Sequence, residues 1–275
     1  MPARKRNDKI VEGKTKILYA VDGSPAEAFV QFKDDITAGD GARHDVISGL
    51  GISSNTTNAN CFRLLNKRGI PTHFIDVAGP RAFRAHCVTM IPLEVVTRRI
   101  ATGSYVKRHG VPEGARFDEL IVEFYIKDDA RHDPLVVCDS FGRRLLLFEA
   151  SKPTSTGAIE ERPIEMIRGG ARCFDRLARL ARATFEILEE AWALQDITLV
   201  DLKVEGGYPV GEPRQIVLAD SITNSEWRIW PDGDPGRRLD KDVYRKLRTV
   251  TQRDLITIRD NYRRVADLTE TFSAL

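Results

Sequence analysis

The sequence predicts an α+β fold with antiparallel sheets, and two observations carry this prediction. Strand-like and helix-like segments come in blocks, in the order strands, helix, strands, long helix, strands, helix, without the regular alternation of a βαβ fold. The chain has 275 residues, of which 42% are hydrophobic, so it has enough apolar material for one large domain or two lobes in close contact.

The first half begins with alternating, β-branched residues in the segment KIVEGKTKILYAV, followed by the turn DGSPAE and the strand AFVQF. This pattern predicts a β-hairpin over residues 9–34. Residues 53–69 have a helical pattern that ends at Gly-Ile-Pro, a helix stop signal. Three strand-like runs follow, separated by Gly-Pro and Ile-Pro. We place a crossover between two lobes at Pro92, which gives domains of residues 1–92 and 93–275.

The second half begins with a strand over residues 120–127, followed by a loop-rich insertion over residues 137–163. Residues 164–194 form the longest helical pattern, in which large apolar residues recur at steps of three and four and predict a buried stripe. The segments DITLVDLKVEGG and RQIVLAD predict two strands, and residues 251–272 an amphipathic helix.

Composition and charge exclude several classes of protein. The formal net charge is +2, too small for a protein that binds nucleic acid along its surface. The four cysteines are far apart and form no C-x-x-C pair, which indicates reduced thiols rather than disulfides or a zinc site. No apolar run reaches the roughly 18 residues of a membrane span. We therefore expect a cytoplasmic protein without nucleic-acid or membrane partners.

Two lysines in EGKTK are candidates for phosphate binding. Lys14 and Lys16 would point to one face of a strand beside a glycine, and two ammonium groups there would hold a nucleotide triphosphate. The spacing is not that of a Walker A loop. The alternative is a solvent-facing strand on which lysines prevent edge-to-edge aggregation.

The segment DLKVE and the downstream Asp220 are candidates for a metal site. Strand alternation places Asp201, Lys203 and Glu205 on one face, and a hairpin would bring Asp220 close to Glu205. Two carboxylates on neighbouring strands suit Mg²⁺, which takes one or two carboxylates together with phosphate oxygens. The alternative is an exposed sheet face with cross-strand salt bridges, each worth under ~1 kcal/mol.

The segment RRIATGSYVKR combines four cations with a small-residue turn, which favours a phosphate site, although a charged surface turn is the alternative. The polar segments KDDARHDP, DDITAGDGAR and LDKDVYRKLR are weaker candidates. Each is equally typical of an ordinary loop or a charged helix surface.

The order and spacing of these motifs resemble the SAICAR synthetase family, from about Lys9 to the end of the chain apart from the insertion. The resemblance implies a two-lobed fold with an ATP-binding N-terminal lobe, similar to ATP-grasp proteins and kinases, and a larger mixed C-terminal lobe. It also implies the family's reaction, in which ATP and Mg²⁺ support the joining of CAIR and L-aspartate through an acyl phosphate to give SAICAR, ADP and phosphate. A homo-oligomer is expected.

The resemblance also implies roles for individual residues. Lys14, Lys16, Lys203 and the backbone at Met90 would bind ATP, and Glu205 and Asp220 would hold Mg²⁺. Arg98, Ser104 and Arg228 would bind the phosphate of CAIR, while Asp40, Lys127 and Asp129 line the same cleft. Lys203, Lys127 and Asp129 are the expected catalytic residues. Lys241 and Arg245 are weaker candidates for contacts with aspartate or CAIR.

Three positions depart from the family pattern. Gly206 stands where the family usually has phenylalanine, which we expect to loosen the packing behind Glu205. Ser225 replaces an aspartate and Leu50 a lysine. Two rivals are left open. One is a paralogous ligase that uses acyl-phosphate chemistry on another carboxylate or amine, and the other is an inactive binding relative. The first is motivated by Gly206, Ser225 and the insertion over 137–163. The second is disfavoured by the intact candidates for the nucleotide and metal site: Lys14, Lys16, Lys203, Glu205 and Asp220.

Overall fold

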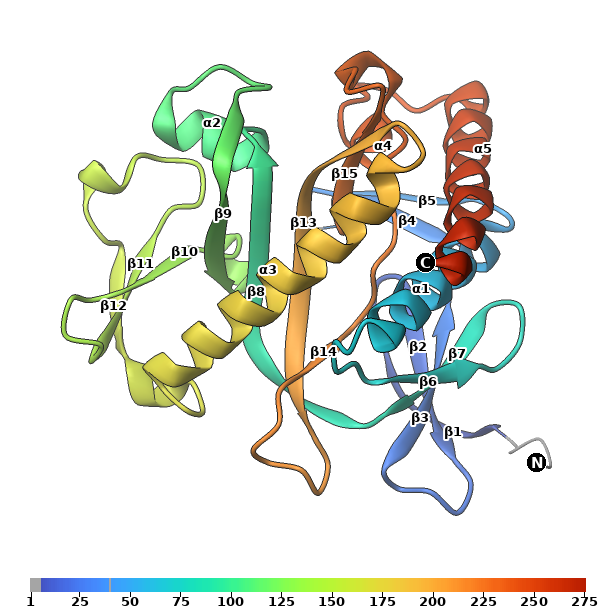
Figure 1. Cartoon of the computed structure of the whole chain (residues 1–275), viewed down its shortest axis with the longest axis horizontal. Helices are drawn as coiled ribbons and strands as arrows, with labels where there is room; N and C mark the ends of the chain where they lie inside the picture. The colour runs from blue at the N-terminus through green and yellow to red at the C-terminus, as the bar shows by residue number, and fades with distance from the viewer. Residues whose placement is uncertain (1–5, 40) are drawn as a thin grey trace.

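The structure is a computed structural model that describes residues 6–39 and 41–275, without the side chains of residues 6, 7 and 129. Its strands form two large antiparallel sheets (Figure 1). The smaller sheet has the order β1 (Arg6–Glu12), β2 (Lys16–Val21), β3 (Glu27–Phe32), β7 (Ala82–His86), β6 (Phe74–Val77). The larger has the order β12 (Glu160–Pro163), β11 (Arg144–Phe148), β10 (Leu135–Cys138), β9 (Arg116–Ile126), β8 (Val88–Ile100), β13 (Ile197–Pro209), β14 (Val217–Ala219), with β15 (Trp227–Pro231) also paired to β13. A separate hairpin joins β4 (Asp35–Ala38) and β5 (Arg43–Val46).

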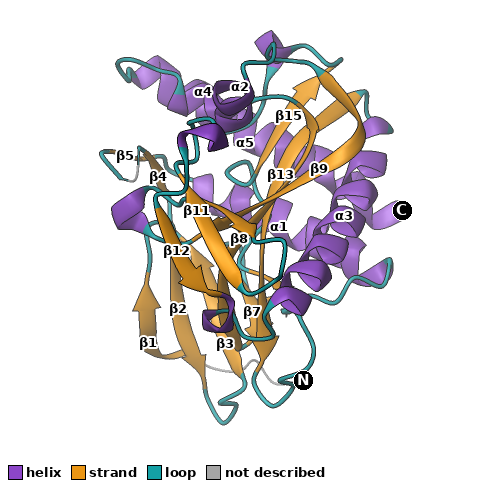
Figure 2. Ribbon diagram, turned by 90° about the vertical axis from the view of Figure 1, so that its left-hand side faces the viewer, coloured by secondary structure: helices purple, strands orange, loops and turns teal. Residues whose placement is uncertain are grey.

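The long helices of the described residues are α1 (Leu50–Lys67), α3 (Ala171–Ala193) and α5 (Gln252–Thr269), and two short ones are α2 (Gly103–His109) and α4 (Asp242–Arg245). Helix α1 packs on the smaller sheet and α3 on the larger, while α5 packs on α1. Helix α3 crosses one face of the larger sheet over β8 and β13 (Figures 1 and 2). Its predicted apolar stripe is confirmed, because the stripe residues are buried: Phe174, Leu177, Ala181, Phe185, Leu188, Trp192.

The two sheets are joined through the segment that precedes β6. Thr72 forms a parallel bridge with Leu218 of β14, and the His73 amide donates to the Leu218 carbonyl oxygen at 2.8 Å. This link holds the end of β14 against the smaller sheet. The residue that follows β14, Asp220, therefore lies where the two sheets meet.

Three expectations about local structure are wrong. The segment KIVEGKTKILYAV is not one strand, because the chain reverses between β1 and β2, where the Gly13 amide donates to the Lys16 carbonyl at 2.8 Å. Pro92 does not interrupt a strand, since β8 continues through it. The insertion over 137–163 is not mainly loop, because β11 and β12 extend the larger sheet. Local patterns miss such pairings because the partner strands supply the hydrogen bonds.

The α+β class with antiparallel sheets is confirmed. The boundary at residue 92 between two domains stays a prediction. None of the helices within residues 6–39 and 41–275 is long and apolar enough to cross a membrane.

Candidate active site

A pocket of about 390 Å³ lies between the two sheets. Apolar side chains from both sheets form most of its wall: Ile10, Leu18, Ala28, Val30, Ala85, Val88, Met90. Its polar end contains Lys16, Lys127, Glu205 and Asp220. An apolar slot that ends in cations and carboxylates suits a ligand with one flat, weakly polar part and one anionic part.

The polar end is built around Glu205 of β13, which is only 4% exposed. Its carboxylate accepts hydrogen bonds from Lys127 Nζ at 2.8 Å and from Lys203 Nζ at 2.9 Å. Lys203 also donates to Glu94 of β8 at 2.8 Å. Glu94 and Glu205 are register partners, so the lysine neutralises two carboxylates that face each other across the sheet. Burial opposes the charge of Lys203, but these carboxylates raise its pKa above the usual value.

Asp220 lies beside Glu205 because β13 and β14 are paired, with Glu205 opposite Ala219. Lys16 Nζ donates to the Asp220 carboxylate and, at 2.7 Å, to Ser221 Oγ. Burial would raise the pKa of Asp220, but the charges of Lys16 and Lys203 outweigh it and lower this pKa to about 2. The backbone of Asp220 has φ of 62°, a left-handed conformation that aspartate tolerates better than most residues. Such strain is typical of functional positions.

His73 packs behind this carboxylate. Its Nε2 lies 3.1 Å from the Asp220 carbonyl oxygen, and its ring packs edge-on against Phe62 and Phe83. Burial lowers the pKa of His73 to about 4. It is therefore neutral at physiological pH, and it supports the turn at Asp220 without adding a charge.

Glu205 and Asp220 fit one side of a Mg²⁺ site. No group of three or more His, Cys, Asp or Glu side chains is placed to hold a metal within the described residues. Two carboxylates could supply part of the coordination of a Mg²⁺ ion, whose other ligands would be water and phosphate oxygens. The three lysines beside them would face the negative charge of that phosphate. The donor set therefore fits a metal–nucleotide complex rather than a metal bound by protein alone.

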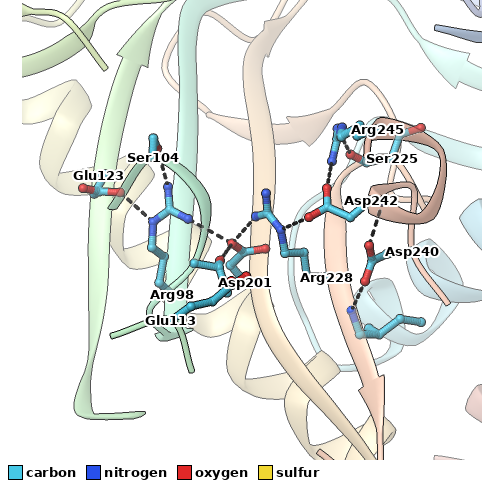
Figure 3. A network of polar contacts seen from close by, with 12 residues as sticks. Arg98, Ser104, Glu113, Glu123, Asp201, Ser225, Arg228, Asp240, Asp242 and Arg245 are labelled. Carbon is cyan, nitrogen blue, oxygen red and sulfur yellow. Dashed lines mark hydrogen bonds and ion pairs between the residues drawn. The ribbon is translucent and has the colours of Figure 1, made fainter. Parts of the chain in front are cut away.

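A second polar centre lies further along the same face of β13 (Figure 3). Asp201 accepts hydrogen bonds from Arg98 Nη1 at 2.9 Å and from Arg228 Nη1 at 2.5 Å. Arg98 also donates to Glu123 at 2.7 Å and contacts Ser104 Oγ at 3.3 Å. The predicted phosphate residues therefore meet in one network, but Arg98 is only 3% exposed and is held by protein carboxylates.

Lys241 lies in a small polar hollow that adjoins Ser221. It is 8% exposed, and its ammonium makes no ion pair or hydrogen bond with any other residue in the described part of the chain. Burial, followed by the charge of Arg245, lowers the pKa of Lys241 to about 8. Arg245 is more exposed and donates to Asp242 at 3.0 Å and to the Ser225 carbonyl at 3.1 Å.

Comparison with known proteins identifies the family. The family model described as SAICAR synthetase matches residues 9–258. The chain belongs to the SAICAR synthetase family. A phosphoribosylaminoimidazole-succinocarboxamide synthase of Roseiflexus castenholzii is 43% identical over 269 residues, which are 96% of this chain and 97% of that protein.

Solved SAICAR synthetases have the same fold. The crystal structure of the synthase from Ehrlichia chaffeensis superposes with a TM-score of 0.78 at 30% identity, covering 96% of this chain and 98% of that one. A SAICAR synthetase in complex with ADP superposes with a TM-score of 0.76 at 31% identity, covering 95% and 97%. The family and fold expected from the sequence are confirmed.

The structure gathers most of the site residues expected for a SAICAR synthetase, although their roles stay predictions. Met90 and Lys16 line the pocket, whereas Lys14 lies in the turn between β1 and β2 and so does not share a strand face with Lys16. Asp40 lies outside the described residues. The backbone of Asp129 starts a 3₁₀ turn after β9, but its side chain is not described.

Sequence reasoning missed three acidic residues of these centres. Glu94 and Glu123 hold lysine and arginine side chains, and Asp201 had no assigned role although it joins two arginines. A signal was present, because Glu94 in PLEVV and Glu123 in IVEFY are each the single charge within a short apolar run. A buried charge needs a partner, so such residues mark a polar centre.

The expectation that Gly206 loosens the packing behind Glu205 is wrong. A Cβ at this glycine would lie 2.7 Å from Leu177 Cδ2 and 3.3 Å from Ile216 Cγ2. The side chains of Leu177 and Ile216 are buried, so they already fill the space that the family's usual aromatic side chain would need.

We expect Gly206→Phe to lower the free energy of unfolding by about 3 kcal/mol or more, because the ring has no space. Adding Leu177→Ala should recover part of this loss, since the smaller side chain vacates that space. Urea denaturation of the two single variants and the double variant measures the coupling. A stability of Gly206→Phe equal to that of the parent protein, or additive effects in the double variant, would contradict this packing.

Proposed function

We propose that this chain is an ATP-dependent ligase that joins CAIR and L-aspartate to give SAICAR, ADP and phosphate. The observation that carries the proposal is the alignment of two centres on one strand. Strand β13 presents Asp201 with its arginines, then Lys203, then Glu205 to one side. The neighbouring pocket extends from Glu205 to an apolar wall. This arrangement supports one place for the substrate phosphate and another for the nucleotide, with the reacting groups between them.

The proposed chemistry accounts for the charged side chains of the pocket. A carboxylate is a poor electrophile, so the γ-phosphoryl group of ATP must first convert it to an acyl phosphate. The amine of aspartate then attacks the carbonyl carbon, and phosphate leaves. Phosphoryl transfer depends on positioning and on neutralising charge. Lys16, Lys127 and Lys203 supply fixed positive charge around Glu205 and Asp220.

ATP and Mg²⁺ are the proposed cosubstrate and cofactor. The SAICAR synthetase with a TM-score of 0.76 is in complex with ADP, and the apolar wall that includes Met90 suits an adenine ring. Glu205 and Asp220 would hold Mg²⁺ together with phosphate oxygens. Bound there, the metal would neutralise charge on the transferred phosphoryl group.

The remaining assignments follow from charge. Arg98, Ser104 and Arg228 would bind the sugar phosphate of CAIR, because an arginine fork matches phosphate oxygens. Lys241 and Arg245 would attract the carboxylates of aspartate or CAIR. Lys14, Asp40 and Asp129 stay predictions as site residues, and so do a homo-oligomeric state and a cytoplasmic location.

The test is an assay of the purified protein with ATP, Mg²⁺, CAIR and aspartate, in which SAICAR absorbance and ADP release are followed. We expect stoichiometric SAICAR and ADP that depend on all four components. ADP release with a different acid or amine, and none with CAIR and aspartate, would indicate the paralogous ligase. Absence of turnover with every pair in a folded protein would indicate an inactive relative.

A further inference from the structure

Asp201 connects the two arginines through the geometry of the sheet. It is the register partner of Arg98 on β8 and of Arg228 on β15, so β13 carries it between them. Its side chain is 4% exposed. Three donors share its Oδ2 atom, because Thr102 Oγ1 also donates to it at 2.9 Å. Figure 3 shows both guanidinium groups turned toward this carboxylate.

The other ends of both arginines lie against the turn that starts α2. Arg98 Nη2 contacts Ser104 Oγ at 3.3 Å. Arg228 Nη2 lies so close to Gly103 that a Cβ there would be 3.1 Å away. Gly103 has φ of 57°, which glycine adopts without strain. Two guanidinium groups and a serine hydroxyl therefore converge at this turn.

We propose that Asp201 is a positioning residue for the sugar phosphate of the substrate. It holds Arg98 and Arg228 by one edge each and aims their remaining N–H groups at the Gly103–Ser104 turn. Two neighbouring guanidinium groups repel each other and would separate without a shared anion. The inference rests on the proposed function, since it takes the phosphate of CAIR as the ligand, and it assigns a role to a residue that need not touch that ligand.

The negative charge of Asp201 also compensates the charges of Arg98, whose side chain is 4% exposed, and of Arg228, whose side chain is 20% exposed. Glu123 and Asp242 hold the Nε atoms of Arg98 and Arg228 at 2.7 Å and 2.8 Å. Glu123 accepts a hydrogen bond from Arg98 and Asp242 accepts one from Arg228, whereas Asp201 accepts hydrogen bonds from both arginines. We therefore expect loss of Asp201 to change the relative position of the two arginines more than loss of Glu123 or Asp242 does.

The experiment compares Asp201→Asn with the parent protein on two substrates, CAIR and its dephosphorylated riboside. We expect the KM for CAIR to rise by about 30-fold, the effect of losing a charge-assisted hydrogen bond. The KM values for ATP and aspartate should change by less than about threefold. The kcat/KM for the riboside should be the same in both proteins, because that substrate has no phosphate to position.

Two results would overturn the inference while the parent protein remains an active ligase. One is an equal loss for CAIR and the riboside, which would mean that Asp201 only stabilises the fold. The other is an unchanged KM for CAIR. A parent protein that makes no SAICAR would instead refute the proposed function itself.

Two further variants keep the test decisive. Asp201→Glu retains the charge but displaces the arginines, so it should show the same selective loss for CAIR even if Asp201→Asn fails to fold. Glu189→Gln is the matched control, because Glu189 of α3 holds the neighbouring Arg99 at 2.7 Å and 2.9 Å on the other face of β8. We expect its KM for CAIR to equal that of the parent protein, and a 30-fold rise there would overturn the specific role of Asp201.

Discussion

Glu205→Gln should lower kcat by about 10³-fold while the protein stays folded, which is the scale of removing one preorganised electrostatic group from an active site. The amide keeps the shape of the side chain but removes the negative charge that faces Lys127 and Lys203. Lys203 retains Glu94 as its partner, so the fold has no new unpaired cation at that position. The loss should therefore appear in turnover and not in stability.

The measurement is kcat as a function of Mg²⁺ concentration, together with thermal unfolding followed by circular dichroism. We also expect Glu205→Asp to recover part of the activity at a raised Mg²⁺ concentration, since the shorter carboxylate still offers oxygen ligands. Glu190→Gln is the control, because the Glu190 side chain is 57% exposed and pairs with Arg68 at the surface. Near-normal turnover of Glu205→Gln with an unchanged Mg²⁺ dependence would remove Glu205 from the metal site.

Lys241→Met should stabilise the protein at pH 7 and impair catalysis. In the folded protein the pKa of Lys241 is about 8, against an ordinary value of 10.5. The protonated form of Lys241 is less favourable in the folded state than in the unfolded chain. Protonation at pH 7 therefore destabilises the fold by about 3 kcal/mol, at 1.36 kcal/mol per pKa unit. Methionine fills a similar volume without the charge, so this cost disappears.

The sign of the pH dependence follows from the same shift. The cost in the parent protein is fully present below pH 8, and it decreases as the pH rises from 8 toward 10.5. The stability gain of Lys241→Met, measured by urea denaturation, should therefore be largest at pH 7 and small at pH 10. Lys246→Met is the control, since Lys246 lies close in sequence but its side chain is 51% exposed. A decrease in stability of Lys241→Met at pH 7 would contradict this account.

The catalytic part of the prediction concerns the substrates. Lys241 is a buried cation without a partner among the described residues, so a bound anionic ligand would stabilise its charge more than that of a cation already paired within the protein. We expect Lys241→Met to raise the KM for CAIR or aspartate by more than about tenfold, while the KM for ATP changes little. A rise in the KM for ATP alone would show that Lys241 contributes to nucleotide binding.

Much of the local structure follows from the sequence, because periodicity reports which face of an element is buried. The stripe from Phe174 to Trp192 identified α3, and alternation in DLKVE placed Asp201, Lys203 and Glu205 on one face of β13. The order of the motifs identified the family, which the comparison with known proteins confirmed. These features can be recognised from the order of residues along the chain, without knowledge of contacts between distant segments.

The rest depended on contacts between distant segments. The reversal at Gly13 to Thr15, the passage of β8 through Pro92 and the strands of the insertion are set by partner strands, and no local pattern specifies a partner. The same reason applies to the site. Burial of Arg98 between Glu123 and Asp201, and the packing of Leu177 against Gly206, join residues far apart in sequence. The sequence by itself determined which groups are available for chemistry, and only the tertiary structure decided which of them are paired, because pairing depends on distances that folding creates.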